Sequence, residues 1–272
     1  MNKKITKVFL FLLAVSLVAL LIYRLPKTPT TKNITQPATN IIPTSTKVIE
    51  EEKKEEITTS TPIKSSSTEI IIKATSTPTG IIKNSVPFTP QAPFGEWSDP
   101  RQQNGCEEAS ALIAVSWARG ETFSLQEAKN EILAISDWEQ EKYDGYQDTS
   151  ARDTVKRIFN GYFKYQKVEV IEDVKILDMI NELSQGNLII VPADGRKLKN
   201  PFFNPPGPEE HMLVITGYNY QTKKFITNDP GTRHGKDYEY SQEVLFDAIR
   251  DYPTGYHQPI IGTPKTIIVI RK

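Results

Sequence analysis

The chain has 272 residues, with 33 basic and 33 acidic side chains, one cysteine and three histidines. Its zero net charge argues against a nucleic-acid-binding protein, because such proteins usually carry a basic excess. A single cysteine excludes both an intramolecular disulfide and a metal site built from several cysteines.

An apolar run over residues 8–23 follows three lysines, and only Ser16 interrupts it. The run is slightly short for a membrane-spanning helix and long for the apolar region of a signal peptide. No small-residue cleavage signal follows it, so we expect segment 1–23 to remain as an N-terminal membrane anchor. The alternative is a signal peptide that is removed, which would leave a secreted protein.

Three basic residues precede the apolar run, and three follow it closely, so the charge count does not decide the membrane orientation. The N-terminal tail before the run has only seven residues, and the run resembles an export signal. We therefore expect the C-terminal part of the chain to lie outside the cytoplasm.

Residues 24–85 contain fourteen threonines and six prolines, and they contain no Phe, Trp, Tyr or Cys. Such a segment cannot bury enough apolar surface to offset the entropy lost on ordering. It is predicted to be a disordered stalk. All three tryptophans lie in residues 86–272, which carry 21 basic and 27 acidic side chains and have the length of one domain.

Within 86–272, helical spacing of apolar residues and a capping box formed by Ser124 and Glu127 predict five helices. Short apolar or alternating runs predict five strands, and a loop rich in Pro and Gly occupies 192–210. Helices come first and an antiparallel sheet second, which is the α+β pattern. The predicted helices are 105–118, 124–135, 148–159, 174–183 and 242–249; the predicted strands are 165–171, 188–191, 212–217, 224–227 and 266–270.

Cys106 is the first candidate for catalysis because it follows Gly105 and begins a predicted helix. The positive end of the helix dipole favours a thiolate at this position. Glu107 and Glu108 follow directly, and their negative charges partly oppose a thiolate. The alternative is that Cys106 is a small apolar residue of the core.

His211 begins an apolar strand directly after the long loop, and Asp229 ends the next strand. A hairpin with a loop at 219–221 places these residues directly opposite each other, with their Cβ atoms about 5 Å apart. A carboxylate there can hold one imidazole nitrogen and leave the other facing a nucleophile. Asn228 is the alternative orienting residue, although a regular strand would turn it to the other face.

Three glutamines, Gln91, Gln102 and Gln103, precede Cys106 and are candidate donors to an oxyanion. His234 and His257 occur in polar turns and are predicted to lie at the surface. The histidines are scattered, and no His-x-x-x-His pair occurs. We expect neither a metal site nor a cofactor.

The order of the candidate residues along the chain resembles that of papain-like cysteine peptidases. In that order a cysteine begins a helix, a histidine begins a strand, and an Asp or Asn ends the next strand. The closer resemblance is to family thirty-nine of the cysteine peptidases, whose founding members remove double-glycine leader peptides. The motifs that carry it span nearly all of 86–272: Val86-Pro87-Phe88 with Gln91, Gly105 to Ser110, His211 to Tyr218, and Asn228 to Gly231.

This resemblance implies a papain-like fold with N-terminal helices packed on an antiparallel sheet. It makes Cys106 the nucleophile, His211 the general base, Asp229 the orienting residue and Gln91 the oxyanion donor. The expected protein is a monomeric, membrane-tethered extracytoplasmic peptidase that hydrolyses peptides or proteins through a thioester. Two alternatives stay open: a cell-wall peptide amidase or transpeptidase with the same triad, and a non-catalytic surface binding module.

Overall fold

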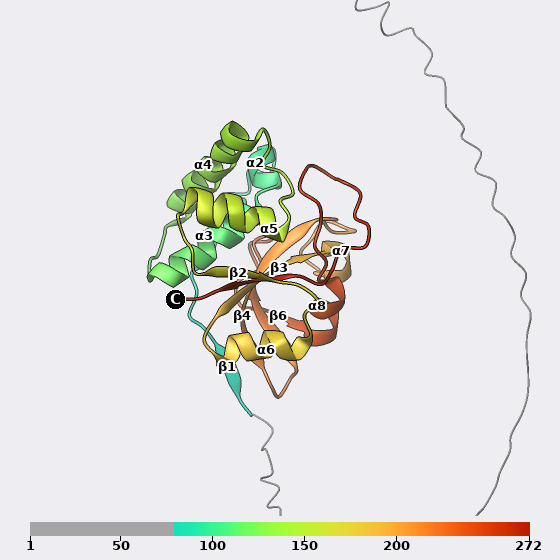
Figure 1. Cartoon of the computed structure of the whole chain (residues 1–272). Helices are drawn as coiled ribbons and strands as arrows, with labels where there is room; N and C mark the ends of the chain where they lie inside the picture. The colour runs from blue at the N-terminus through green and yellow to red at the C-terminus, as the bar shows by residue number, and fades with distance from the viewer. Residues whose placement is uncertain (1–78) are drawn as a thin grey trace, which may run out of the picture. The chain divides into compact units, whose positions relative to one another are not determined.

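The computed structural model describes residues 79–272, whose centre is an antiparallel sheet with helices on both faces (Figure 1). The strands of this part of the chain follow the order β2–β7–β3–β4–β5–β6, and β1 pairs with the far end of β4. Their bounds are β1 Ile81–Lys83, β2 Val168–Ile171, β3 Leu188–Ala193, β4 His211–Asn219, β5 Lys224–Asn228, β6 Tyr238–Ser241 and β7 Ile267–Ile270.

One face of the sheet packs against the N-terminal helical layer. Alternate residues of the central strands, among them Ile190, Met212 and Val214, join the core that this layer forms. The layer consists of α2 Pro100–Gln103, α3 Cys106–Arg119, α4 Leu125–Tyr143, α5 Ala151–Thr154 and the π-helix η1 Val155–Tyr162.

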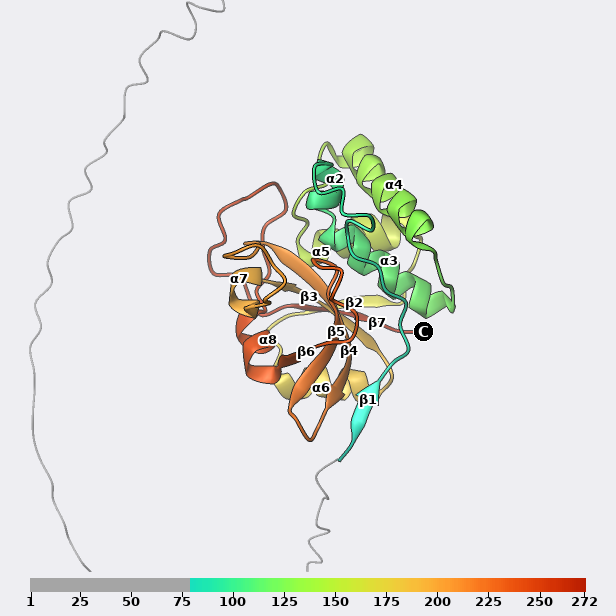
Figure 2. The ribbon, with the colours of Figure 1, turned by 180° about the vertical axis from the view of Figure 1, so that it is seen from behind.

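The opposite face is covered by α6 (Ile176–Ser184) and α8 (Gln242–Ala248), while the short α7 (Gly195–Leu198) follows β3 (Figure 2). The intervening strand residues, including Ile189, Val191 and Leu213, pack into this second core. Burial on both faces explains why β3 and β4 read as continuous apolar runs in the sequence. The predicted α+β class with an antiparallel sheet is confirmed, but helices cover both faces of the sheet.

Local signals located several helix starts correctly. Ser124 Oγ accepts the Glu127 backbone N–H at 3.2 Å, and the Glu127 carboxylate accepts the Ser124 N–H at 2.7 Å, so the capping box is present. Helix α4 nevertheless continues to Tyr143, beyond the predicted end at 135. Its added turns are held by a tertiary contact, because Trp138 packs edge-on against Tyr162 of η1, and Trp138 also packs against Tyr143 within the helix.

The sheet includes residues that precede the predicted domain boundary at 86. Ile81–Lys83 form β1, which pairs antiparallel with the end of β4, and Ile82 packs against the second core. The sequence analysis assigned these residues to the stalk because their composition matches it. Their hydrogen bonds come from a partner strand that lies 134 to 138 positions later in the chain. The sequence analysis also did not predict strand β6 or helices α2 and α7. Helix α7 lies inside the predicted loop 192–210.

The predicted anchor, residues 1–23, and the predicted stalk up to residue 78 lie outside the described residues. Within 79–272, no helix has both the length and the apolar character needed to cross a bilayer.

Candidate active site

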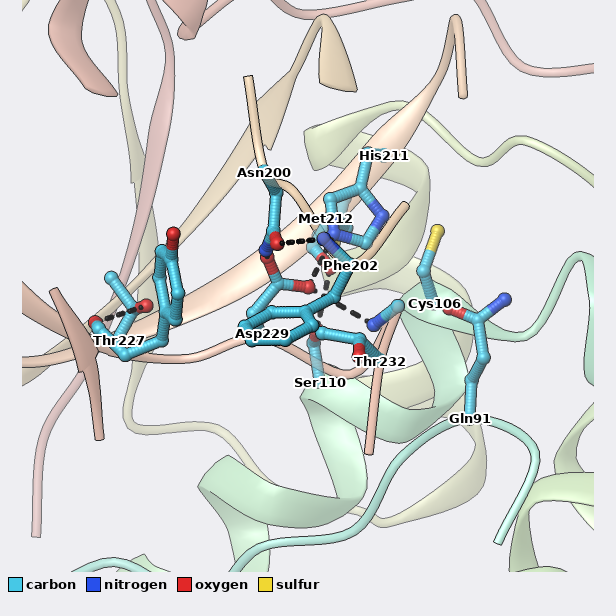
Figure 3. A network of polar contacts seen from close by, with 12 residues as sticks. Gln91, Cys106, Ser110, Asn200, Phe202, His211, Met212, Thr227, Asp229 and Thr232 are labelled. Carbon is cyan, nitrogen blue, oxygen red and sulfur yellow. Dashed lines mark hydrogen bonds and ion pairs between the residues drawn. The ribbon is translucent and has the colours of Figure 1, made fainter. Parts of the chain in front are cut away.

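Cys106 and His211 line the same cleft, which has a volume of about 910 Å³. Its walls come from the segment before α2, the start of α3, and the loops that follow α7, β5 and α8. Figure 3 shows His211 between Cys106 and Asp229, with Gln91 beside the cysteine. The tertiary structure therefore brings together all four residues that the sequence selected.

Cys106 is the first residue of α3, as predicted. Gly105 precedes it, and a Cβ at that position would lie 2.6 Å from the Arg101 carbonyl oxygen, so only glycine fits between α2 and α3. The Cys106 side chain is 6% exposed. It donates to Glu107 Oε2 at 3.0 Å.

The charge state of this thiol differs from the expectation. Burial raises the pKa of Cys106 well above its ordinary value, and the neighbouring Glu107 carboxylate raises it further. The sequence favoured a thiolate because the helix dipole acts on it. In the folded chain, burial and the Glu107 carboxylate raise the thiol pKa more than the helix dipole lowers it, which favours a neutral thiol at rest.

The register of the β4–β5 hairpin differs from the predicted one. Val214 pairs with Asn228, and a bulge between Ile215 and Gly217 shifts the remaining pairs. The prediction that His211 lies directly opposite Asp229 was therefore wrong. Asp229 follows the end of β5, and its Oδ1 still lies 2.8 Å from His211 Nε2. This is a diagonal contact, which remains within reach of side chains on one sheet face.

Asp229 is fully buried and accepts several hydrogen bonds. Besides His211, the Gly231 backbone N–H donates to Oδ1 at 3.0 Å, and the Tyr240 hydroxyl donates to Oδ2 at 2.6 Å. Burial disfavours the charged form, but the charge of His211 and these hydrogen bonds together hold the pKa of Asp229 below its ordinary value. Asp229 is thus a carboxylate that can hold the imidazole in one orientation.

Two residues that support Asp229 were missed from the sequence. Asn200 donates to the Tyr240 hydroxyl at 2.7 Å and approaches Asp229 Oδ2 at 3.4 Å. Asn200 follows α7, and Tyr240 belongs to β6, the strand that was not predicted. No local pattern marks either residue, because only the packing of these elements around Asp229 brings them to it.

The imidazole of His211 is held on two sides. Its Nε2 contacts Asp229, so Nδ1 is the nitrogen left for the thiol, and Figure 3 shows the ring extending toward Cys106. The ring of Phe203 packs edge-on against it, with ring centroids 5.3 Å apart. A Cβ at Gly231 would lie 2.9 Å from His211 Cε1 and 2.9 Å from Phe203, so a glycine is required here.

Alanine at Gly231 is therefore expected to displace the imidazole from the cleft. We expect Gly231→Ala to lower kcat by about tenfold or more, because catalysis depends on placing reacting groups to within an ångström. The midpoint of thermal unfolding should change little, because the added methyl meets two side chains at the edge of the cleft. The measurement is steady-state hydrolysis beside thermal unfolding; unchanged kcat would contradict the expectation.

The side chain of Gln91 lies beside Cys106 but is already engaged. Its Nε2 donates to the carbonyls of Gln102 at 3.0 Å and Gln103 at 2.8 Å, and its buried Oε1 has no partner among the described residues. The amide has two N–H groups, and both are used. Donation to an oxyanion would require Gln91 to release one of these carbonyls, so this role stays a prediction.

The remaining candidate residues from the sequence have other surroundings. Asn228 donates to the Pro87 carbonyl at 3.0 Å and accepts from the Asp237 N–H at 3.1 Å, so its amide holds backbone rather than His211. Gln102 is buried against Glu96, whereas Gln103 is exposed and lines the cleft. His234 and His257 are exposed, as predicted.

His257 also belongs to the one group of described residues with the donor spacing of a metal site. Asp148, Glu210 and His257 each offer an atom within 4.8 Å of the others. The three residues already contact one another. His257 Nδ1 lies 3.0 Å from the Glu210 carboxylate, and the backbone N–H of His257 donates to the Asp148 carboxylate at 2.8 Å. The arrangement explains how two buried carboxylates are accommodated at the cleft wall.

Comparison with known proteins gives one family match. The sequence model of the group described as the Peptidase_C39 like family matches residues 83–255. Among solved structures, a Bacillus anthracis protein described as a C39-like peptidase is similar, with a TM-score of 0.47 and 14% identity, over 71% of this chain and 98% of that chain. No curated protein matches the chain.

Proposed function

Because the chain belongs to the Peptidase_C39 like family, we propose that it is a cysteine peptidase with Cys106 as nucleophile, His211 as general base and Asp229 as orienting residue. Membership of a peptidase family implies peptide or protein substrates. The observation that carries the proposal is the contact of 2.8 Å between His211 and Asp229, together with the cleft that His211 and Cys106 both line. This arrangement of residues from separate elements supports thiol-mediated acyl transfer.

The reaction starts from a neutral thiol. As a peptide carbonyl enters the cleft, the Cys106 proton passes to His211 Nδ1 and the sulfur attacks the carbonyl carbon. The imidazolium then gives this proton to the leaving amine, and a thioester remains on Cys106. Water, deprotonated by His211, hydrolyses the thioester and restores the thiol. Asp229 stays ionised throughout and stabilises the imidazolium.

The oxyanion formed during attack needs donors near Cys106. The backbone N–H of Cys106 is one of the first amides of α3, which have no partner inside the helix. It also lies at the positive end of the helix dipole, so it suits a developing negative charge. Gln91 is the proposed second donor, once its amide turns away from one of the two carbonyls that it now contacts.

We also propose that the peptidase acts outside the cytoplasm and is tethered to the membrane. The support is sequence alone: three lysines followed by the apolar run 8–23, then a Thr- and Pro-rich segment of low apolar content. Such a segment would let the peptidase domain reach substrates away from the membrane surface.

Digestion of a peptide library by the purified full-length chain tests the function. We expect discrete cleavage products in mass spectra, and we expect prior treatment with iodoacetamide to remove them. Cys106 is the only thiol of the chain, so alkylation changes one known atom. Cleavage that survives complete alkylation, or a library left intact by the unmodified chain, would overturn the proposal.

A further inference from the structure

A cluster of buried carboxyl groups lies beneath the nucleophile, and the triad chemistry does not use it. Glu107 is 1% exposed, and Glu108 and Glu139 are fully buried. Acidic side chains are rarely buried without basic partners, because removal from water disfavours their charge. Because these carboxyl groups lie near Cys106, their protonation can affect the thiol.

Glu107 contacts the nucleophile directly. Its Oε2 accepts the thiol of Cys106 at 3.0 Å, and its Oε1 accepts the hydroxyl of Tyr252 at 2.7 Å. Tyr252 follows α8 and is 1% exposed, so this hydrogen bond is shielded from solvent. The carboxyl group therefore sits between two donors, one of which is the reacting atom.

The groups around Glu107 are mostly acidic. Asp148, from the loop before α5, raises the pKa of Glu107, while the hydrogen bonds of Cys106 and Tyr252 lower it. With burial as the largest cause, the net effect raises its pKa to about 7.

The more distant members of the cluster carry little charge near neutral pH. Burial and neighbouring carboxylates raise the pKa of Glu108 well above its ordinary value, and Ser136 donates to this residue at 2.8 Å. On α4, burial and the charge of Glu107 raise the pKa of Glu139 to about 8, although Arg157 of η1 opposes the shift. Among the basic residues that line the cleft with Cys106 are His211, Arg233 and His257.

We propose that Glu107 is a positioning residue for the nucleophile of the proposed peptidase: as a carboxylate it holds the proton on the Cys106 sulfur, and as a carboxylic acid it donates this hydrogen bond to the thiolate. The inference rests on the proposed function for its catalytic meaning. The contact at 3.0 Å carries it, because a carboxylate oxygen can only accept this hydrogen bond, whereas a protonated oxygen can donate it to the sulfur.

The proton balance of the two states follows from these contacts. In the first state the sulfur carries its proton, Glu107 is ionised and His211 is neutral. Uptake of one proton gives the second state, in which the thiol proton has moved to His211 Nδ1 and Glu107 carries the added proton on Oε2. The second state contains the thiolate–imidazolium pair with a donor on each side of the sulfur. The nucleophile should therefore be most reactive on the acidic side of neutrality.

Alkylation of Cys106 by iodoacetamide, measured on the full-length chain from pH 5 to 8.5, tests this role without any substrate. The wild-type rate should fall as the pH rises through about 7, where Glu107 loses its proton. Glutamine mimics the protonated acid. We expect Glu107→Gln to react about tenfold faster than wild type at pH 8, because a like charge beside a thiol shifts its pKa by a unit or more. At pH 5.5 the two rates should agree.

Two further variants separate the role of Glu107 from a general effect of changing the buried cluster. Glu108→Gln removes a neighbouring buried carboxyl that does not contact the sulfur, so it should retain the wild-type pH profile. Tyr252→Phe removes a donor that stabilises the Glu107 carboxylate, so the fall in rate should move to higher pH. A Glu107→Gln profile identical to wild type, or a Tyr252→Phe profile that does not move, would overturn the proposal. Because no peptide is hydrolysed in these measurements, a failed peptidase assay would not affect their outcome.

Discussion

Alanine at Cys106 is expected to reduce peptide hydrolysis to the uncatalysed background while the domain stays folded. The chain has no second thiol that could replace the nucleophile. The substitution removes one sulfur atom at the cleft and leaves the packing of α3 on the sheet intact. The measurements are product formation with peptides that the wild type cleaves and the midpoint of thermal unfolding. Wild-type hydrolysis by Cys106→Ala would refute the mechanism.

The other two triad positions should form a graded series. His211→Ala should cost most, about 10²- to 10⁴-fold in kcat, because the thiol loses its proton acceptor and the leaving amine loses its donor. Asp229→Ala should cost less, because the imidazole remains but loses the partner that orients it. Asp229→Asn should retain the most activity, since its carbonyl oxygen can still accept from Nε2.

Asn228→Ala is the matched control for this series, because the residue is adjacent to Asp229 but contacts backbone groups on another side. It should leave kcat near the wild-type value. If Asp229→Ala were fully active and Asn228→Ala inactive, the orienting role would belong to Asn228, and the contact at 2.8 Å would have no catalytic meaning.

The free energy of unfolding is expected to fall as the pH rises from about 5 to 8.5. Glu107 and Glu139 have pKa values raised from 4.5 to about 7 and about 8 in the folded chain. A carboxyl whose pKa is raised on folding binds more protons in the folded state than in the unfolded state. Its contribution to the free energy of unfolding is therefore full below pH 4.5, and it is lost as the pH rises through the pKa of the folded state. Asp229, whose pKa is lowered, acts oppositely, but only below its ordinary value of 3.8.

Glu139→Gln isolates this effect, because both carboxylate oxygens of Glu139 are buried without a hydrogen-bond partner among the described residues. We expect the variant to be more stable than wild type at pH 8.5, by a few kcal/mol, and to depend less on pH. Glu141→Gln, on the exposed face of the same helix, is the control and should follow wild type. Thermal unfolding at several pH values measures both. A wild-type stability that rises with pH over this window would contradict the assignment.

Local sequence determined several elements and the candidate reactive residues. The capping box at Ser124 located the start of α4, and the helical spacing after Gly105 and the apolar runs of β3 and β7 located α3, β3 and β7 to within a few residues. The relevant interactions lie within one turn of helix or one strand, so a short window contains them. Likewise, a cysteine at the start of a helix and a histidine at the start of a strand are visible without knowledge of the fold.

Tertiary structure alone decided the hydrogen-bonding network and the charge state of the site. The turn between Asn219 and Lys224 and the bulge after Ile215 together set the hairpin register, and partners distant in the chain, Asn200 and Tyr240, completed the surroundings of Asp229. The start of the domain at β1 depends likewise on pairing with a distant strand. The helix dipole at Cys106 can be read from the sequence, but the burial that outweighs it cannot. A pKa depends on solvent exclusion and on every charge nearby, and both are fixed only when the helices close over the sheet.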